Sequence, residues 1–271
     1  MKVEQWLKKA AKQLDNAGIG SAYLDVLILL EDELKKDRSH ILAHPEIELS
    51  KTKLKRLDAK LKRRAGHLPL AFIRGHTEFY GRKFLVNRYT LEPRPESETM
   101  IDLLLKLPLP SLPFIADVGT GSGCLGITAA LELQDPQVDL YDIDASALAV
   151  AKHNVELHEL KLKAYKRDLL SRQVRPYEVI LANLPYVPDR YRLNQAAAME
   201  PRIAIFGGQD GLDIYRRFFQ QLRRFSWRPK FVLTESLPPQ HQDLATLAQA
   251  AGFSLVDMDG FVQAFRPDPN F

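Results

Sequence analysis

The sequence predicts an α/β protein whose sheet is mostly parallel and is preceded by a small helical domain. The first 75 residues carry apolar side chains at helical spacing. From Phe114 onward, short apolar segments alternate with segments of helical periodicity, and a glycine-rich turn joins the first apolar segment to a helix. Such alternation is typical of a parallel sheet that helices cover on both faces.

Composition narrows the class of protein further. The chain has 271 residues, of which 45% are hydrophobic and 27% are charged, enough for one large α/β domain and a smaller second one. No segment approaches the ~20 consecutive apolar residues of a membrane span. The single cysteine, Cys124, cannot form an internal disulfide, and no Cys/His cluster has the spacing of a metal site. We therefore expect a cytoplasmic protein without a structural metal.

The N-terminal region predicts a helical bundle. Residues 3–17 place Val3, Trp6, Leu7, Ala10, Ala11 and Leu14 on one helical stripe. Ser21 is a candidate cap for a second helix that extends through Leu34, and Ser50 is a candidate cap for a third. Residues 1–75 hold 16 Lys/Arg against 10 Asp/Glu. This excess fits either a surface that meets an acidic partner or RNA, or a solvated helical face.

The connection between the two domains contains a hairpin and a proline-rich turn. Aromatic and β-branched residues around Gly81 predict the hairpin, and the prolines in P-R-P-E-S-E exclude helix until about Ser97. The predicted domains are therefore residues 1–75 (helical), 76–96 (hairpin linker) and 97–271 (α/β).

The α/β part is predicted element by element from its periodicity. Strands are expected at Phe114–Val118, at Val138–Ile143, shortly before Asp168, at Glu178–Ala182, at Phe231–Thr234, and near Leu255 and Ala264. Helices are expected at Gly121–Leu133, Ala145–His158, Gly211–Phe225 and Pro239–Ala251.

The turn D-V-G-T-G-S-G-C-L-G, Asp117–Gly126, is the first motif with chemical meaning. Its glycines let the backbone turn tightly and bring a ligand close to main-chain N–H groups. The candidate cofactor-binding residues are Gly119, Thr120, Gly121, Ser122 and Gly123. Gly121, Gly123 and Gly126 also fit G-x-G-x-x-G, a dinucleotide pattern that is weak alone, and a structural turn would need only one or two glycines.

Two carboxylates extend this candidate site. Asp142 follows the next strand at the distance expected for a carboxylate that binds ribose hydroxyls. Ribose occurs both in dinucleotides and in S-adenosylmethionine, so Asp142 does not separate them. Asp144 competes for this role, but it is also placed to cap the following helix. Asp168 follows the third strand and could reach an adenine, although a loop aspartate is more often a solvated turn residue.

The motif N-L-P-Y, Asn183–Tyr186, separates the alternatives. It directly follows a strand, so it should lie at the same sheet edge as the glycine turn and Asp142. An Asn oxygen and a backbone carbonyl can accept the two N–H bonds of a planar nitrogen, Pro185 restricts the turn, and Tyr186 can stack on the planar group. The alternative is that N-L-P-Y is only a turn that ends the strand and has no role in binding.

The sequence therefore predicts a class I S-adenosylmethionine-dependent methyltransferase that acts on an amide or amine nitrogen. A sulfonium methyl is already activated, which agrees with the lack of metal ligands and of a Ser/His/Asp pattern. An NAD-dependent dehydrogenase is the alternative enzyme class, but it gives no reason for N-L-P-Y. A non-enzymatic binding module would not need the whole constellation.

The chain also resembles the peptide chain release factor N5-glutamine methyltransferases, from about Leu61 to Gly252. The matching segments are R-R-A-G-H-L-P-L-A-F-I-R-G, L-E-P-R-P-E-S-E, D-V-G-T-G-S-G-C, D-I-D-A-S-A-L-A-V-A-K-H-N, R-D-L-L, N-L-P-Y-V and E-P-R-I-A-I-F-G-G-Q-D-G-L-D-I-Y-R. The run Glu200–Arg216 and the run Pro93–Glu98 are uncommon outside this family and its close relatives.

This resemblance implies a Rossmann-like, seven-stranded sheet behind an N-terminal domain that docks the release factor. The substrate would be the glutamine of that factor's Gly-Gly-Gln loop, which implies a role in translation termination and possible contact with the ribosome, without membrane or specific nucleic-acid binding. Carried over by position, Gly119–Gly123, Asp142, Leu169 and Asn183 would bind the cofactor, and Asn183, Leu184, Pro185 and Tyr186 would hold the glutamine amide.

The chain departs from the family pattern at two places, of which the first bears on the substrate. The family usually has N-P-P-Y, whereas this chain has Leu184, which would contribute its backbone carbonyl. N-L-P-Y also occurs in rRNA adenine dimethyltransferases, whose extra domain follows the sheet instead of preceding it. The second departure is in T-E-S-L at Thr234–Leu237, where Ser236 follows the glutamate and the family tends to have a glycine. The alternative substrates are a ribosomal-protein glutamine and an adenine N6 of RNA or DNA.

Overall fold

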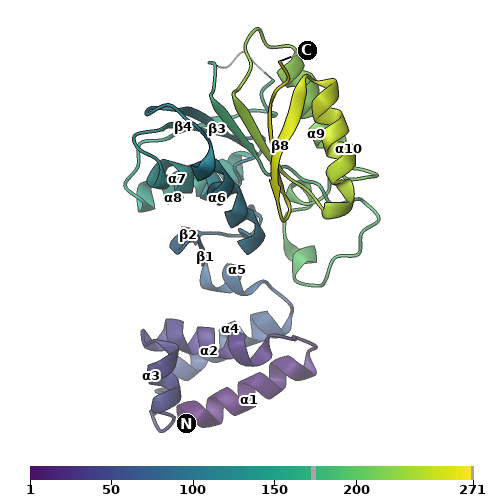
Figure 1. Cartoon of the computed structure of the whole chain (residues 1–271). Coiled ribbons are helices and arrows are strands. Elements are labelled where there is room, and N and C mark those ends of the chain that lie inside the picture. The colour runs from purple at the N-terminus through teal and green to yellow at the C-terminus, as the bar shows by residue number, and fades with distance from the viewer. Residues whose placement is uncertain (172–174, 270–271) are drawn as a thin grey trace. The chain divides into compact units, whose positions relative to one another are not determined.

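A computed structural model describes residues 1–171 and 175–269 of the chain. These described residues form two compact units (Figure 1). The first consists of Met1–Gly75 together with Leu193–Met199, and the second contains the described residues of His76–Arg192 and Glu200–Phe271. No helix among the described residues is long and apolar enough to cross a membrane.

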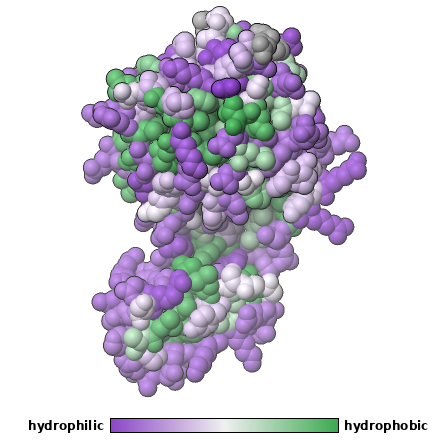
Figure 2. Space-filling view, in the orientation of Figure 1, coloured by the Kyte–Doolittle hydropathy of each residue, from purple (hydrophilic) through white to green (hydrophobic). Residues whose placement is uncertain are grey.

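The first unit is a helical bundle around a closed apolar core. Its helices are α1 (Val3–Asn16), α2 (Ala22–Leu34), α3 (Arg38–Ala43), α4 (Lys51–Ala65), α5 (Leu70–Arg74) and the 3-10 turn η2 (Ala197–Met199). The predicted stripe of α1 is buried, including Trp6 and Leu14, and packs with Leu29, Leu30 and Leu57. Figure 2 shows that hydrophilic side chains cover much of this unit's visible face.

Polar contacts in this unit distinguish the predicted caps. Ser50 caps α4, since its hydroxyl accepts a hydrogen bond from the N–H of Lys53 (3.3 Å). The prediction that Ser21 caps α2 is wrong: the helix begins at Ala22, but the Ser21 backbone is not extended and its side chain makes no capping bond.

Inside the unit, Arg64 donates to the buried carboxylate of Asp25 (2.6 Å), which neutralises both charges.

The second unit begins with the predicted hairpin and contains the sheet. Its strands are β1 (His76–Phe79), β2 (Arg82–Leu85), β3 (Phe114–Val118), β4 (Gln137–Asp142), β5 (Lys163–Lys166), β6 (Val179–Ala182), β7 (Phe231–Glu235), β8 (Phe253–Asp259) and β9 (Val262–Pro267). Its helices are η1 (Pro95–Ser97), α6 (Glu98–Lys106), α7 (Cys124–Glu132), α8 (Ala145–Leu157), η3 (Arg202–Ala204), α9 (Asp213–Arg223), η4 (Pro238–Gln240) and α10 (His241–Ala250).

Within the described residues, seven strands form one mixed sheet in the order β5-β4-β3-β6-β7-β9-β8. The strands from β5 to β7 are parallel, whereas β9 runs antiparallel to β7 and to β8. The predicted α/β class with a mostly parallel sheet is therefore confirmed. Because β3 and β6 are neighbours, the segments that follow them leave the sheet side by side at one edge.

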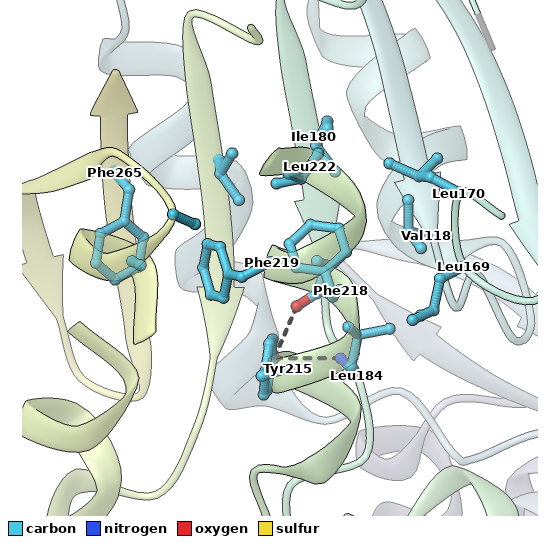
Figure 3. Close-up of a cluster of buried hydrophobic side chains, with 14 of the residues drawn as sticks. Val118, Leu169, Leu170, Ile180, Leu184, Tyr215, Phe218, Phe219, Leu222 and Phe265 are labelled. Atoms are coloured by element: carbon cyan, nitrogen blue, oxygen red, sulfur yellow. Dashed lines mark hydrogen bonds between the residues drawn. The ribbon is translucent and has the colours of Figure 1, made fainter. Parts of the chain in front are cut away.

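Helices cover both faces of this sheet. Side chains of α6, α7 and α8 form one apolar cluster against it, and side chains of α9 and α10 form the other. Figure 3 shows Phe218, Phe219 and Leu222 of α9 packed over the sheet, beside Ile180 of β6. These two layers hold the strand ends in place, which is the condition for a site built on them.

One predicted helix boundary is wrong for a physical reason. The helix after the glycine turn begins at Cys124 and not at Gly121. Gly119, Gly121 and Gly123 all have positive φ angles, between 55° and 85°, which a right-handed helix does not accommodate. The three residues thus remain a loop, with their N–H groups outside the helical hydrogen-bond pattern.

Candidate active site

A cavity lies at the carboxyl ends of β3, β4, β5 and β6. Most of the sequence-predicted site residues line it: Gly119, Thr120, Gly121, Ser122, Asp142, Asp168, Leu169, Asn183, Leu184 and Pro185. Gly123 and Tyr186 are not among its lining residues. The cavity is also lined by residues that the sequence analysis did not assign to the site, among them Tyr89–Arg94, Ser97, Leu125, Ala147, Arg167, Ile203, Ala204, Ile214 and Arg217.

The glycine loop is held from behind by a buried carboxylate. Oδ2 of Asp117 accepts hydrogen bonds from the hydroxyl of Thr120 (2.5 Å) and from the N–H of Gly126 (2.9 Å). Burial raises the pKa of Asp117 to about 6, although both hydrogen bonds act against this shift. A Cβ on Gly126 would lie 2.4 Å from Leu140 and 2.9 Å from Asp117, so this glycine lets α7 pack closely on the sheet.

Asp142 faces the cavity with both carboxylate oxygens already oriented. Oδ2 accepts from the N–H of Gly121 and Oδ1 accepts from the N–H of Asp144, each at 2.8 Å. Burial raises the pKa of Asp142, and the backbone hydrogen bonds partly offset that rise. Asp144 caps α8 through the N–H of Ser146 (2.7 Å), so the two neighbouring aspartates have different partners.

Asp168 and Leu169 follow β5 and line the cavity together. The carboxylate of Asp168 pairs with Arg217 of α9, a partner that the sequence did not indicate. Leu169 has a left-handed backbone (φ 54°) and is buried, while the next N–H, of Leu170, donates to Gln221 of α9 (2.8 Å). Both contacts tie the β5 loop to α9, which explains how a strained leucine is maintained.

Asn183 lies at the end of β6 with its amide nitrogen fully engaged. Nδ2 donates to Oγ of Ser97 and to Oε2 of Glu235, each at 2.9 Å. The hydroxyl of Tyr186 donates to Oε1 of the same glutamate (2.8 Å). Burial next to Glu235 raises the pKa of Tyr186 far above its usual range, so the phenol remains protonated. The predicted stacking of Tyr186 on a substrate stays a prediction.

The loop that contains Asn183 is clamped from α9. Tyr215 is fully buried, and its hydroxyl contacts the carbonyls of Ala182 (2.8 Å) and Glu235 (2.6 Å). The same oxygen accepts from the N–H of Leu184 (3.3 Å), which Figure 3 shows, and from that of Glu235 (3.2 Å). Leu184 is only 2% exposed and packs against the glycine loop at Gly119.

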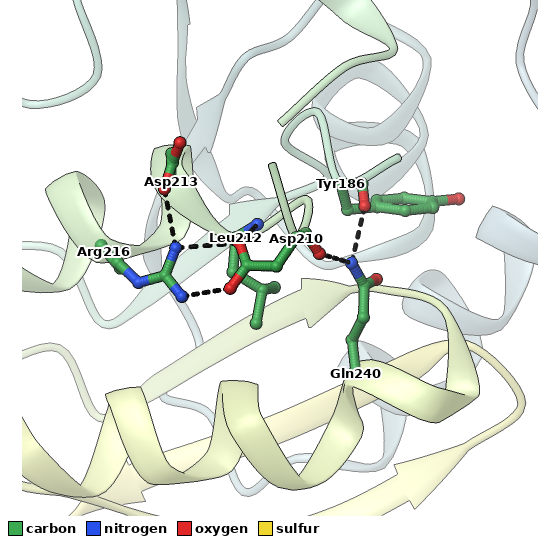
Figure 4. Close-up of polar contacts among 6 residues, drawn as sticks. All are labelled: Tyr186, Asp210, Leu212, Asp213, Arg216 and Gln240. Atoms are coloured by element: carbon green, nitrogen blue, oxygen red, sulfur yellow. Dashed lines mark hydrogen bonds and ion pairs between the residues drawn. The ribbon is translucent and has the colours of Figure 1, made fainter. Parts of the chain in front are cut away.

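A second clamp lies on the other side of the loop. Nε2 of Gln240 donates to the carbonyls of Tyr186 (2.8 Å) and Asp210 (2.7 Å), as Figure 4 shows. A Cβ on Gly207 would lie 2.4 Å from the carbonyl oxygen of Pro185, and one on Gly211 would lie 2.1 Å from that of Tyr186. The run F-G-G-Q-D-G-L-D thus needs glycines because its backbone lies directly against N-L-P-Y.

Solved structures with a similar fold include the hMettl16 catalytic domain and a methyltransferase from Pyrococcus furiosus. The first is 14% identical, with a TM-score of 0.55 over 81% of this chain and 82% of that one. The second is also 14% identical, with a TM-score of 0.51 over 80% of this chain and 96% of that one. The fold is that of the class I methyltransferases, whose methyl donor is S-adenosylmethionine.

Sequence comparison identifies the family within this class. The model of the PrmC N-terminal domain matches residues 5–75, and that of the methyltransferase small domain matches residues 98–200. A release factor glutamine methyltransferase of Koribacter versatilis is 37% identical over 82% of this chain and 81% of its own length. The release factor glutamine methyltransferase of Coxiella burnetii is 33% identical over 93% of this chain and 92% of its own length. The chain belongs to the release factor glutamine methyltransferase family.

The cavity fits the methyl donor of this class. Its backbone cradle at Gly119–Gly123 carries no side chain at the positions where the chain turns, so a ligand can approach the main chain. Asp142 supplies acceptor oxygens for hydroxyl groups, while Leu125, Ala147 and Leu169 supply apolar surface. Hydroxyl acceptors beside an apolar wall suit a nucleoside, which has a polar ribose and a flat, weakly polar base.

Proposed function

We propose that this enzyme transfers a methyl group from S-adenosylmethionine to the side-chain amide nitrogen of the glutamine in the Gly-Gly-Gln loop of peptide chain release factors. The observation that carries the proposal is the position of Asn183–Tyr186 beside the glycine loop, at the ends of the neighbouring strands β6 and β3. A relative that is 37% identical over 82% of this chain is named a release factor glutamine methyltransferase.

The proposed cofactor residues follow from their places in the cavity. The glycine loop would lie against the polar end of the methyl donor, because its glycines let a ligand approach the main chain, and Asp142 would accept hydrogen bonds from the ribose hydroxyls. Asp168 and Leu169 lie on the β5 loop, where they would flank the adenine. When bound, S-adenosylmethionine supplies a methyl group on a positively charged sulfur, which needs no further activation.

The protein's own part in the transfer is to position the substrate nitrogen. An amide nitrogen is a weak nucleophile because its lone pair is delocalised into the carbonyl. Oδ1 of Asn183 and the carbonyl of Leu184 would each accept one of its N–H bonds and so fix its direction. Pro185 restricts the loop, and the ring of Tyr186 would contact the plane of the amide.

The proposal extends to the helical unit and to the place of action. Residues 1–75 would dock the release factor, since the basic excess of this region suits an acidic partner surface. The division into a docking domain (1–75), a hairpin linker (76–96) and a methyltransferase domain (97–271) is part of this proposal. A release factor substrate implies a role in translation termination in the cytoplasm, and it is compatible with association with the ribosome.

Mass spectrometry of purified release factor, incubated with the enzyme and S-adenosylmethionine, tests the proposal. We expect a gain of one methyl group on the glutamine of the Gly-Gly-Gln loop. Asn183→Ala should lower the rate on the order of 100-fold, because it removes an orienting acceptor. Parallel incubations use ribosomal proteins and ribosomal RNA. Methylation of an adenine or of a ribosomal-protein glutamine, with none of the release factor, would contradict the proposed substrate.

A further inference from the structure

Catalysis by Asn183, as proposed above, requires that its side-chain oxygen and not its nitrogen face the substrate amide. The two ends of an asparagine amide have almost the same shape but opposite hydrogen-bonding character. If the side chain were turned over, its N–H groups would oppose those of the glutamine, and the substrate would not be held. The surroundings of Asn183 therefore decide whether the site functions.

These surroundings consist of hydrogen-bond acceptors. Glu235 ends β7, is only 1% exposed, and its Oε2 accepts from Nδ2 of Asn183 (2.9 Å). The second proton of Nδ2 goes to Oγ of Ser97 (2.9 Å), and the Ser97 hydroxyl in turn bonds to Glu235. No hydrogen bond within the described part of the chain reaches Oδ1 of Asn183, which leaves that oxygen for a ligand.

The alternative orientation would be strongly disfavoured. An ionised carboxylate only accepts hydrogen bonds, so a turned-over Asn183 would place its oxygen against Oε2 of Glu235 without a proton between them. The nitrogen would at the same time lose two acceptors in a buried setting, where an unmade hydrogen bond costs most. The hydroxyl of Tyr186 occupies Oε1 of Glu235 and thereby fixes the carboxylate itself (2.8 Å).

We propose that Glu235 is a positioning residue for methyl transfer, which sets the orientation of the Asn183 amide and presents its oxygen to the substrate nitrogen. Ser97 is the second acceptor of the Asn183 amide nitrogen. The serine of P-R-P-E-S-E and the glutamate of T-E-S-L therefore act together on one side chain, that of Asn183. The inference rests on the proposed function of Asn183. Burial raises the pKa of Glu235, while hydrogen bonds from Ser97, Tyr186 and Asn183 oppose that rise.

The test compares Glu235→Met with Glu235→Gln in the full-length enzyme. Methionine removes the acceptor, whereas glutamine can still accept from Asn183 through its oxygen and donate to the phenol oxygen of Tyr186 through its nitrogen. We expect kcat to fall on the order of 100-fold in Glu235→Met and clearly less in Glu235→Gln. Binding of S-adenosylhomocysteine should stay close to that of the wild type, which separates lost positioning from lost folding.

Thr234→Val is the matched control on the same strand. Thr234 is buried, and its hydroxyl has no hydrogen-bond partner among the described residues, so this isosteric change should leave kcat unchanged. A double-mutant cycle adds the decisive comparison. If Glu235 acts through Asn183, then Glu235→Met should have little further effect in an Asn183→Ala background. Additive effects of the two substitutions, or equal losses in Glu235→Met and Glu235→Gln, would overturn the inference.

A measurement without substrate separates this inference from the proposed function. In ¹⁵N NMR of the wild type, the side-chain NH₂ protons of Asn183 should exchange slowly with water, because both are bonded inside the protein. In Glu235→Met they should exchange faster, and in Thr234→Val they should not. Unchanged exchange in Glu235→Met would refute the positioning role. Absence of methyl transfer to a release factor by the wild type would instead refute the proposed substrate.

Discussion

Asp117 shows how a residue of the glycine motif can act without touching the ligand. Its carboxylate lies behind the loop, 1% exposed, and bonds to Thr120 and Gly126. Both contacts end on the same oxygen, so the loop is folded around one acceptor. The acidic residue ahead of the glycines therefore has a structural task, whereas Asp142 lines the cavity.

The pH dependence of stability should reveal Asp117. Its pKa is about 6 in the folded protein and about 3.8 in the unfolded chain, so the folded state binds the extra proton between these values. The contribution of Asp117 to the free energy of unfolding is thus highest below pH 4 and falls as the pH rises through 6. Asp117→Asn should abolish this fall, about 2–3 kcal/mol, in urea titrations of both proteins from pH 4 to 7.5. Parallel pH profiles of the two proteins would show that Asp117 does not titrate as described.

Asp142 should be measurable through cofactor binding alone. We expect Asp142→Ala to weaken binding of S-adenosylhomocysteine by about 1.5–3 kcal/mol, the size of lost hydrogen bonds to a charged group. Calorimetry measures this directly. Asp144→Ala is the comparison: Asp144 lines the same cavity, but its carboxylate caps α8 through Ser146, so this change should mainly lower the melting temperature. Equal affinities of the wild type and Asp142→Ala would remove Asp142 from the ribose site.

At the scale of elements, the loop after β6 is held by contacts from several directions. Tyr215 of α9 joins it to β7, and Gln240 of η4 joins it to the segment at Asp210. Leu184 packs its buried apolar side chain against Gly119. The proline that is usual at this position in the family would instead restrict the backbone φ angle. Loop geometry is therefore determined by the packing of its neighbours as well as by Pro185.

Removal of one hydroxyl should test this clamp. Tyr215→Phe keeps the ring in the core but deprives buried backbone groups of Ala182, Leu184 and Glu235 of their partner. We expect a loss of about 1–3 kcal/mol in the free energy of unfolding and a lower kcat. Tyr165→Phe, on the far strand β5, is the control. A variant with wild-type stability and rate would mean that the hydroxyl does not hold the loop.

Periodicity made the elements predictable, and strand ends made part of the site predictable. Asp142 and Asn183 were placed correctly at one edge because parallel strands bring their carboxyl ends together. The short helices α3 and α5 were missed, since five or six residues are too few to show a period. Glu235, Tyr215 and Gln240 act through tertiary contacts that no local pattern encodes. The closely spaced glycines of F-G-G-Q-D-G were a usable signal of close backbone approach.

At the scale of the whole molecule, the helical unit has its own core and its own charge. Lys55 and Lys62 of α4 are exposed, and they lie on one face of the helix because seven residues separate them. A docking role predicts that these charges act on encounter with the substrate rather than on the chemical step.

Charge reversal should therefore change association more than turnover. We expect Lys55→Glu with Lys62→Glu to slow association with the release factor and to weaken its dependence on salt, with kcat retained at saturating substrate. Stopped-flow binding at several salt concentrations measures both effects. Lys161→Glu with Lys163→Glu, an equal charge change at two exposed positions of the second unit, is the control. Identical association rates in all three proteins would argue against docking by α4.

The strand order has a consequence for how the enzyme is made. During synthesis the central strand β3 emerges first, and β4 and β5 extend the sheet on one side of it. The residues proposed for the methyl donor are then all present, apart from Asn183. The other side needs β6, β7 and finally Gln240, whose contacts shape the acceptor loop. A nascent chain would thus carry most of the donor residues before its acceptor loop, but the α9 contacts that hold the β5 loop and the Gln240 clamp must both form before methyl transfer.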